Sequence, residues 1–223
     1  EHQAGHDAPG CEAAELEAER PMRRVFVRAF AIDRLEVSNA DHRRCVSAGA
    51  CSPARSGAVE PRAELPVVQL TWREARAYCR FVGGELPTEA QWEYAAHGSS
   101  ERSFPWGHAW DQKLAAFGTL GSEPQPVRDN SGGKSFFGLL NMAGNVAELV
   151  LDRYHAPYDL ALPSVDPVEL RGPQRGGERV LRGGSWRSPP VRLRTRARAA
   201  IAEDEARDDV GLRCAYPVAP APL

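Results

Sequence analysis

Hydrophobic and polar residues follow one another along this chain in short segments, most of them ended by glycine, proline or polar residues. The β-branched and aromatic run Val25–Ile32 predicts a strand, and the short apolar run Pro66–Leu70 predicts a second one. Ser38–Ala48 predicts a helix, because Ser38 is a good N-cap and Gly49 suits the C-terminal stop. The pattern therefore indicates many short elements.

Two capping boxes open the next predicted helices. In a capping box, a Thr side chain and a Glu or Gln three residues later bond each other's backbone N–H groups. Thr71–Glu74 has this form, and the apolar residues after it recur at helical spacing until Gly83. Thr88–Gln91 has it too, and its helix is predicted to run to about Ala96.

The second half of the chain gives weaker signals. Residues 98–137 are rich in Gly, Pro, Ser and Asn and predict a long ordered loop region, which usually indicates a functional or ion-stiffened surface. Arg179–Arg182 and Val210–Ala215 predict late strands. Four arginines alternate with other residues along Arg192–Arg198 and would share one face of a strand. They suggest an anion or partner patch, but the acidic residues of 203–209 are expected to neutralise them.

Composition favours one globular domain. The 223 residues are 42% hydrophobic and 26% charged, enough to bury a sizeable core. We expect a polar leader at 1–22, a domain at 23–217 and a tail at 218–223. The start at Glu1 suggests that a signal peptide or tag has been removed. The net charge of -2 favours neither a nucleic acid nor an anionic membrane surface, and no apolar run is long enough for a transmembrane segment.

The chain has five cysteines and no CxxC pair, and their spacing does not suit a zinc site. Cys45 and Cys51 flank a Gly-containing turn, so a local disulfide is expected. The odd count leaves one thiol over, and Cys11 in the leader is the candidate for a free, lipidated or intermolecularly paired cysteine. The alternative is a cytosolic protein with five reduced cysteines.

Six motifs carry a resemblance to a known family. They are Phe30–Asn39 (FAIDRLEVSN), Leu86–Ala96 (LPTEAQWEYAA), Phe104–Gly107 (FPWG), Gly138–Glu148 (GLLNMAGNVAE), Arg179–Trp186 (RVLRGGSW) and Gly211–Ala215 (GLRCA). Together they resemble the formylglycine-generating enzyme, or sulfatase-modifying factor, family. The resemblance implies a loop-rich α+β domain of the C-type-lectin-like kind, with few short strands and helices, and a disulfide between Cys79 and Cys214.

The chemistry of the family's active enzyme does not carry over. That enzyme oxidises a substrate cysteine with two copper-binding cysteines placed shortly after Gly-Gly-Ser, and Cu(I) prefers such soft thiolates. Here the segment Trp186–Leu193 (WRSPPVRL) holds no Cys, His or Met, and its nearest polar residue is Ser188. Ala147 and Leu149 also stand where the family has tryptophans. We therefore assign no catalytic residue and expect neither copper nor formylglycine-generating activity.

The resemblance also implies a calcium site. Asn141, Gly144, Val146 and Glu148 match positions that hold calcium in the family, and their side-chain and carbonyl oxygens form the hard-ligand set that Ca²⁺ prefers. The alternative is that the asparagines satisfy loop backbone groups without an ion. We favour the ion, because the long loop region needs stiffening.

Two functions follow from these observations. The first is a non-catalytic binding or structural module, exported to the periplasm, outer membrane or cell exterior as part of a protein or envelope assembly. Its partner would be another protein or, as a second choice, a glycan, and its surface would include Trp110, Trp186, Ser188 and Arg192.

The alternative is an accessory enzyme or maturation factor that uses a site other than the copper-cysteine site. It needs a concave pocket with convergent polar groups. Asn145, Glu148, Arg182 and Ser188 are the candidates to form that pocket.

Overall fold

The structure is a computed structural model that describes residues 18–55, 62–100, 102–115, 123–129, 133–157, 161–173 and 175–218. Its helices are α2 (Asn39–Ser47), α3 (Trp72–Phe81) and α4 (Glu89–His97), with 3-10 turns η1 (Gln112–Leu114) and η3 (Pro190–Leu193). Its strands are β1 (Phe30–Ile32), β2 (Ala147–Arg153), β3 (Glu178–Arg182), β4 (Ala199–Ala202), β5 (Val210–Gly211) and β6 (Ala215–Pro217). This loop-rich α+β architecture confirms the predicted fold class.

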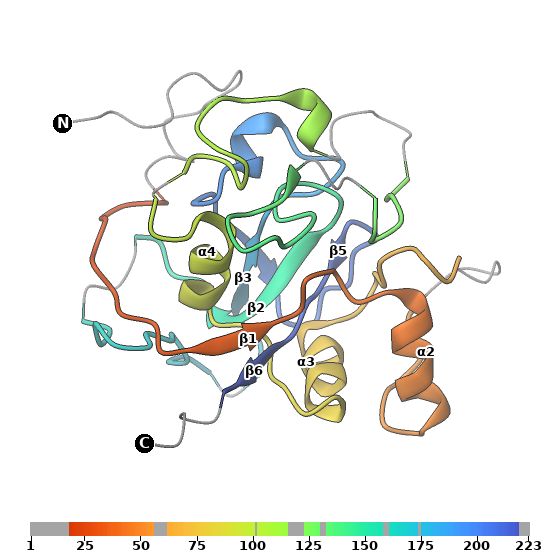
Figure 1. Ribbon diagram of the computed structural model, residues 1–223. Helices are drawn as coiled ribbons and strands as arrows, with labels where there is room; N and C mark the ends of the chain where they lie inside the picture. The colour runs from red at the N-terminus through yellow and green to blue at the C-terminus, as the bar shows by residue number, and fades with distance from the viewer. Residues whose placement is uncertain are drawn as a thin grey trace, which may run out of the picture.

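The strands form two sheets. The larger has the order β4-β3-β2-β5, and its strands are antiparallel except for the parallel pair β2 and β5. In the smaller, β1 pairs antiparallel with β6, with Ile32 opposite Ala215. Figure 1 shows β1 and β6 side by side, so the early and late parts of the described chain are joined there.

The three described helices begin where the caps predict. Thr71 and Thr88 both form complete capping boxes, in which the Thr71 N–H lies 2.8 Å from Glu74 and the Thr88 N–H lies 2.9 Å from Gln91. The Ser38 hydroxyl accepts a hydrogen bond from the Asp41 N–H, which confirms the N-cap of α2. These ends are fixed locally, because each cap satisfies N–H groups that have no partner within the helix.

Two predicted strands are wrong in whole or in part. Of Val25–Ile32, only the end forms β1, and Phe26 makes an isolated bridge with Val165. Pro66–Leu70 is not a strand, although Pro66 bridges to Ser38. Gln69 has a φ of 59°, a left-handed conformation that interrupts an extended segment.

The second half of the chain holds strands that the sequence pattern did not predict. β2 is buried along nearly its whole length, so it shows no alternation of apolar and polar residues. β4 has the sequence AAIA, and alanine carries little strand signal. The predicted strand Val210–Ala215 is divided between β5 and β6, which lie in different sheets. The arginine segment is not a strand, because η3 and turns occupy it.

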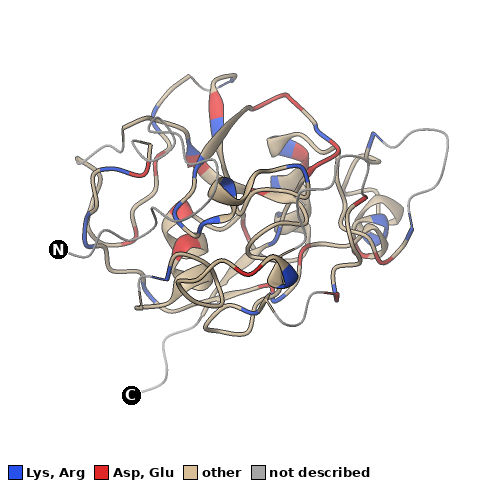
Figure 2. Ribbon diagram, turned by 90° about the horizontal axis from the view of Figure 1, so that it is seen from above, with Lys and Arg blue, Asp and Glu red and all other residues tan. Residues whose placement is uncertain are grey.

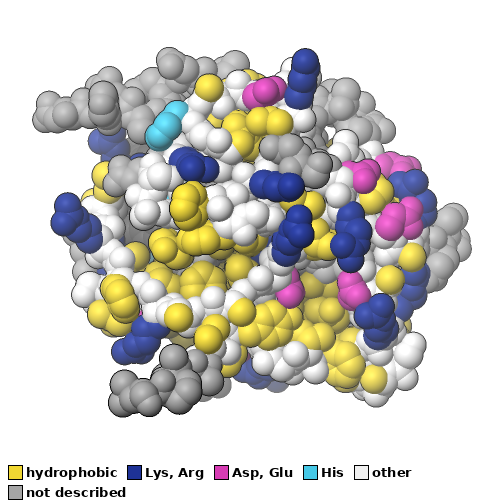
Figure 3. Space-filling view, in the orientation of Figure 1, with side chains coloured by type: hydrophobic (Ala, Val, Ile, Leu, Met, Phe, Trp, Pro, Cys, Tyr) yellow, Lys and Arg dark blue, Asp and Glu magenta, His cyan; other side chains and the backbone are white. Residues whose placement is uncertain are grey.

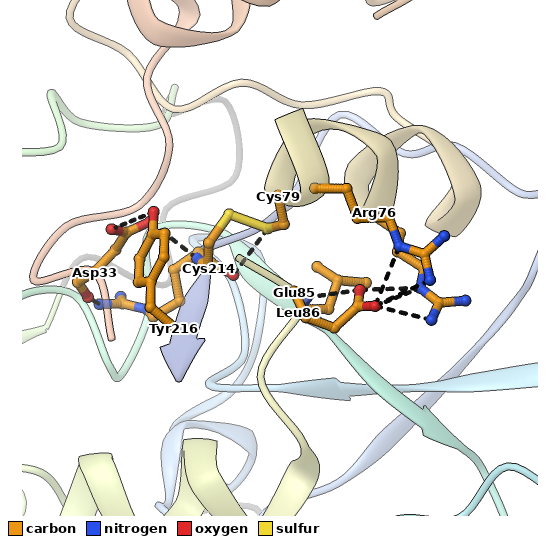
Figure 4. Close-up of a disulfide and its surroundings, with 9 residues drawn as sticks. Asp33, Arg76, Cys79, Glu85, Leu86, Cys214 and Tyr216 are labelled. Atoms are coloured by element: carbon orange, nitrogen blue, oxygen red, sulfur yellow. Dashed lines mark hydrogen bonds and ion pairs between the residues drawn. A yellow bond between two sulfur atoms is a disulfide. The ribbon is translucent and has the colours of Figure 1, made fainter. Parts of the chain in front are cut away.

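Both disulfides expected from the sequence are present. Cys45 and Cys51 are joined across a Cα–Cα distance of 5.3 Å, and Cys79 and Cys214 across 5.4 Å. The second bond ties α3 to the segment before β6, as Figure 4 shows. Cys11 lies outside the described residues.

Charged residues of both signs are interspersed along the ribbon, as Figure 2 shows. The face in Figure 3 carries many apolar side chains across its middle and lower part. Among the described residues, no helix is long and apolar enough to cross a membrane.

Candidate functional site

A cleft of about 370 Å³ lies beside the segment that follows the Gly-Gly-Ser motif. Strands β2, β3 and β4 contribute its apolar wall through Ala147, Leu181 and Ala199. The polar side chains that line it are Ser188, Arg192, Arg198, Arg207, Asp209 and the hydroxyl-bearing Tyr154. We call this site the arginine cleft.

A serine–aspartate–arginine chain builds one wall of the arginine cleft. The Ser185 N–H donates to Ser188 Oγ at 2.9 Å, and the Ser185 hydroxyl donates to Asp209 at 2.8 Å. Arg207 donates two hydrogen bonds to the same carboxylate, at 2.9 and 2.8 Å. Burial acts to raise the pKa of Asp209, but the hydrogen bonds from Arg207 and Ser185 outweigh it and lower that pKa. The wall is therefore fixed and Asp209 stays ionised.

The turn into this wall requires glycine. Gly183 and Gly184 have φ angles of 83° and 63°. A Cβ on Gly184 would lie 2.7 Å from the Arg192 carbonyl oxygen. Only glycine combines this conformation with so close an approach of two backbone segments. The Gly-Gly-Ser motif thus sets the distance between Ser185 and η3, and with it one side of the cleft.

The arginines after η3 have partners other than the predicted ones. Arg194 pairs with Glu19, and Arg198 forms a two-pronged pair with Glu89 at 2.6 and 3.0 Å. Of the predicted partners, Glu203 instead approaches Arg73 and Arg179. For Arg194 and Arg198 the prediction that residues 203–209 neutralise the arginine row is therefore wrong, because tertiary packing brings other carboxylates to them.

The predicted binding surface is found only in part. Ser188 and the exposed Arg192 line the arginine cleft. Trp186 is only 8% exposed: its backbone N–H donates to the Asn145 carbonyl, and the Arg187 guanidinium lies over its ring at 4.2 Å. The prediction of an exposed Trp186 is wrong. Trp110 is half-buried and packs with other aromatic rings near Phe104.

The pocket predicted for an accessory enzyme does not form. Asn145 and Glu148 are fully buried and Arg182 is 1% exposed, so none of them lines the arginine cleft. Only Ser188 of the four predicted residues does so. The cleft residues that sequence reasoning missed are Tyr154, Arg207 and Asp209, and only their nearness to family motifs could have indicated them.

The residues predicted to bind calcium lie in a buried polar network. Glu148 accepts hydrogen bonds from Arg213 at 2.7 and 2.6 Å and from the Trp92 indole at 2.6 Å. The amides of Asn141 and Asn145 both donate to a carboxylate that the sequence did not indicate, Glu36, at 2.9 and 2.6 Å.

Glu36 completes this network. It also accepts from the Val146 N–H at 3.3 Å and is only 2% exposed. Burial, followed by the nearby charge of Glu148, raises the pKa of Glu36 to about 8. Burial therefore favours the protonated form of this carboxyl.

These contacts bear on the calcium site. Both oxygens of Glu148 already accept charge-assisted hydrogen bonds, and the asparagine amides are turned to Glu36. No group of three or more His, Cys, Asp or Glu side chains that could hold a metal occurs in the described segments. Calcium remains a prediction from the resemblance.

Two proteins of known activity are similar to this chain in sequence. The chain is 37% identical over 175 residues to a formylglycine-generating enzyme of Streptomyces coelicolor, covering 69% of this chain and 53% of the relative. It is 30% identical over 234 residues to the hercynine oxygenase of Mycolicibacterium smegmatis, covering 82% and 52%. The chain thus spans about half the length of these two relatives.

Solved structures show the same fold at low identity. PvdO from Pseudomonas aeruginosa has a TM-score of 0.78 at 22% identity, covering 96% of this chain and 89% of its own. Treponema denticola variable protein 1 has a TM-score of 0.70 at 24% identity, covering 86% of both chains. The sequence of residues 3–218 matches the domain described as sulfatase-modifying factor enzyme 1-like. Since this match covers nearly the whole sequence, the chain belongs to the sulfatase-modifying factor family.

Proposed function

We propose that this domain is a non-catalytic binding module on the formylglycine-generating-enzyme scaffold and that the arginine cleft is its ligand surface. The observation that supports this most is the content of the segment after Gly-Gly-Ser. Where the family's enzyme has copper-binding thiolates, Trp186–Leu193 offers the hydroxyl of Ser188 and the guanidinium of Arg192. A neutral hydroxyl is a poor copper ligand and forms no redox disulfide.

The cysteines in the described part of the chain do not replace the missing pair. The four in the described part of the chain are all joined in two disulfides, and these four are fully or largely buried. Of the three arginines that line the cleft, Arg207 pairs with Asp209 and Arg198 with Glu89, so an anionic ligand would contact chiefly the exposed Arg192. Guanidinium groups bind carboxylate and phosphate groups in a two-pronged geometry.

Export and assembly with another protein belong to the same proposal. Two disulfides in one domain are typical of oxidising compartments. Peptide mapping under non-reducing conditions, on protein taken from its natural source, tests this point. Free thiols at Cys79 and Cys214 would place the protein in a reducing compartment and reject export.

The test of the non-catalytic role is a copper and oxidation assay. The purified domain is titrated with Cu(I) in competition with a chelator and then incubated with a cysteine peptide and oxygen. The enzyme of Streptomyces coelicolor serves as the positive control. We expect no stoichiometric copper binding and no loss of peptide thiol above background. One tightly bound copper ion together with turnover of the cysteine peptide would reject the proposal and indicate that this chain is an active enzyme.

A further inference from the structure

The chain's own N-terminal segment lies on the arginine row. We call residues 18–27 the strap. Arg194 donates to both carboxylate oxygens of Glu19, at 3.1 and 2.5 Å, and the two side chains are only 6% and 9% exposed. Arg198 donates to the Ala18 carbonyl at 3.2 Å, and Arg196 approaches the Met22 sulfur at 3.3 Å. Three successive alternate arginines thus contact one short peptide segment.

The strap spans a large cavity instead of packing into one. A space of about 510 Å³ lies between the strap and α4, with Pro21 and Val25 in its roof and Ala90 and Tyr94 opposite. Met22 and Phe26 of the strap remain 68% and 63% exposed. The strap's apolar side chains therefore contribute little to holding it in place.

The strap is attached at its two ends. Beyond the arginine contacts, Arg23 donates to the Leu162 carbonyl at 2.9 Å, and the Phe26 backbone bonds Ser164 and Asp166 at 2.7 and 2.8 Å. The pair of Glu19 and Arg194 is nearly buried, so the cost of taking both charges out of water offsets much of their attraction. The first end is thus held by an ion pair and one backbone contact, and the second end by backbone hydrogen bonds.

Two of the arginines that contact the start of the strap are also held by hydrogen bonds to residues outside it. Arg198 is held by two hydrogen bonds from its guanidinium to Glu89, and Arg194 Nε donates to the Val191 carbonyl at 3.0 Å. Arg198 lines both the arginine cleft and the cavity under the strap, so its side chain lies between the two spaces. A receptor whose side chains are already fixed loses little entropy when it binds a ligand.

We propose that Arg194, Arg196 and Arg198 form a docking groove for a peptide segment of a partner protein, and that the strap fills this groove in the free domain. The partner segment carries a glutamate followed by a large apolar residue at the third position, as Glu19 and Met22 do in the strap. The carboxylate displaces Glu19 from Arg194, and the apolar residue takes the place of Met22 beside Arg196, at the edge of the cavity. This deepens the proposed function and rests on it, because Ala18 of the strap lies at the edge of the arginine cleft.

The test uses the strap itself as the probe. A fluorescein-labelled peptide of residues 18–26 (AERPMRRVF) is titrated into the full chain, and binding is followed by fluorescence anisotropy. In the wild type the attached strap competes at an effective concentration of about millimolar, so the peptide binds weakly. In Glu19→Gln this competition is reduced, and we expect at least about tenfold tighter binding of the free peptide, since occupancy in cis lowers apparent affinity in proportion.

Matched controls separate the carboxylate from the rest of the segment. The same peptide with Gln in place of its Glu should bind Glu19→Gln at least about tenfold more weakly, because it cannot form the two-pronged pair. Arg194→Lys keeps the charge and the fold but loses that geometry, and should also lose the peptide. Arg44→Gln, an exposed arginine on α2, should change nothing.

Three results would overturn the docking groove. They are a Glu19→Gln variant that binds no better than wild type, equal binding of the Glu and Gln peptides, and a concentration-dependent dimer of Glu19→Gln that the peptide dissociates. The last would assign the groove to a second copy of this chain. Each leaves the non-catalytic role intact, which only the copper and oxidation assay can reject.

Discussion

The disulfide that joins Cys79 to Cys214 should carry a large share of the domain's stability. It closes a separation of 135 residues, and both cysteines are fully buried. The chain-entropy relation gives about 5 kcal/mol for this bond, against about 2 kcal/mol for the bond from Cys45 to Cys51, which closes a separation of 6 residues. The two bonds therefore form a matched pair within one chain.

The experiment compares two double variants, Cys79→Ala/Cys214→Ala and Cys45→Ala/Cys51→Ala, by urea unfolding. The short-loop variant should lose about 2 kcal/mol and unfold at lower urea. The long-loop variant should lose more than twice as much, a loss that equals the whole stability of a domain at the lower end of the usual range of about 5–15 kcal/mol. Equal losses in the two variants would refute the reasoning, since loop length would then have no influence on stability.

Three further predictions follow from the buried polar network. Glu148→Gln should lower the free energy of unfolding by about 3–5 kcal/mol, measured in urea, because it leaves Arg213 buried without its counter-charge. Arg187→Gln, which breaks an exposed pair, should lower it by less than about 1 kcal/mol. Similar losses in the two variants would contradict this prediction. The pKa of Glu36 is raised from 4.5 to about 8, so the folded state keeps a proton that the unfolded chain releases between these values. Stability should then fall as pH rises from 5 to 8, by up to about 1.4 kcal/mol per pH unit, and Glu36→Gln should flatten this slope; an unchanged slope would exclude Glu36 as its source. If the calcium site exists, EDTA should lower the melting temperature and added calcium should restore it. Asn141→Ala should abolish both responses. An unchanged melting temperature together with no copurifying calcium would reject the site.

The elements that the sequence predicted well are those whose signals are local. The caps at Ser38, Thr71 and Thr88 lie within three residues of the groups they bind, so the helix starts could be placed from the sequence. β2 could not be predicted in this way, because it is covered on both faces and its periodicity is lost. Gln69 shows the opposite case, in which an apolar run that favours a strand is interrupted by one left-handed residue.

The candidate site was predicted less well than the fold. Ser188 and Arg192 were found because they follow the Gly-Gly-Ser motif. Asp209 was expected to neutralise the arginine row and instead pairs with Arg207, while the row pairs with Glu19 and Glu89. The pairs of Arg194 with Glu19 and of Arg198 with Glu89 join residues more than a hundred positions apart, and no spacing in the sequence indicates them.

The sequence by itself determined the family, the loop-rich α+β class, both disulfides and the absence of cysteines from Trp186–Leu193. These properties depend on residue identity at motif positions, which the chain carries in order. Only the tertiary structure decided that Trp186 is buried, that Glu148 is bound to Arg213, and that the strap covers the arginine row. Burial and ion pairing depend on which distant segments the fold brings together, and a charge in the sequence does not specify its partner.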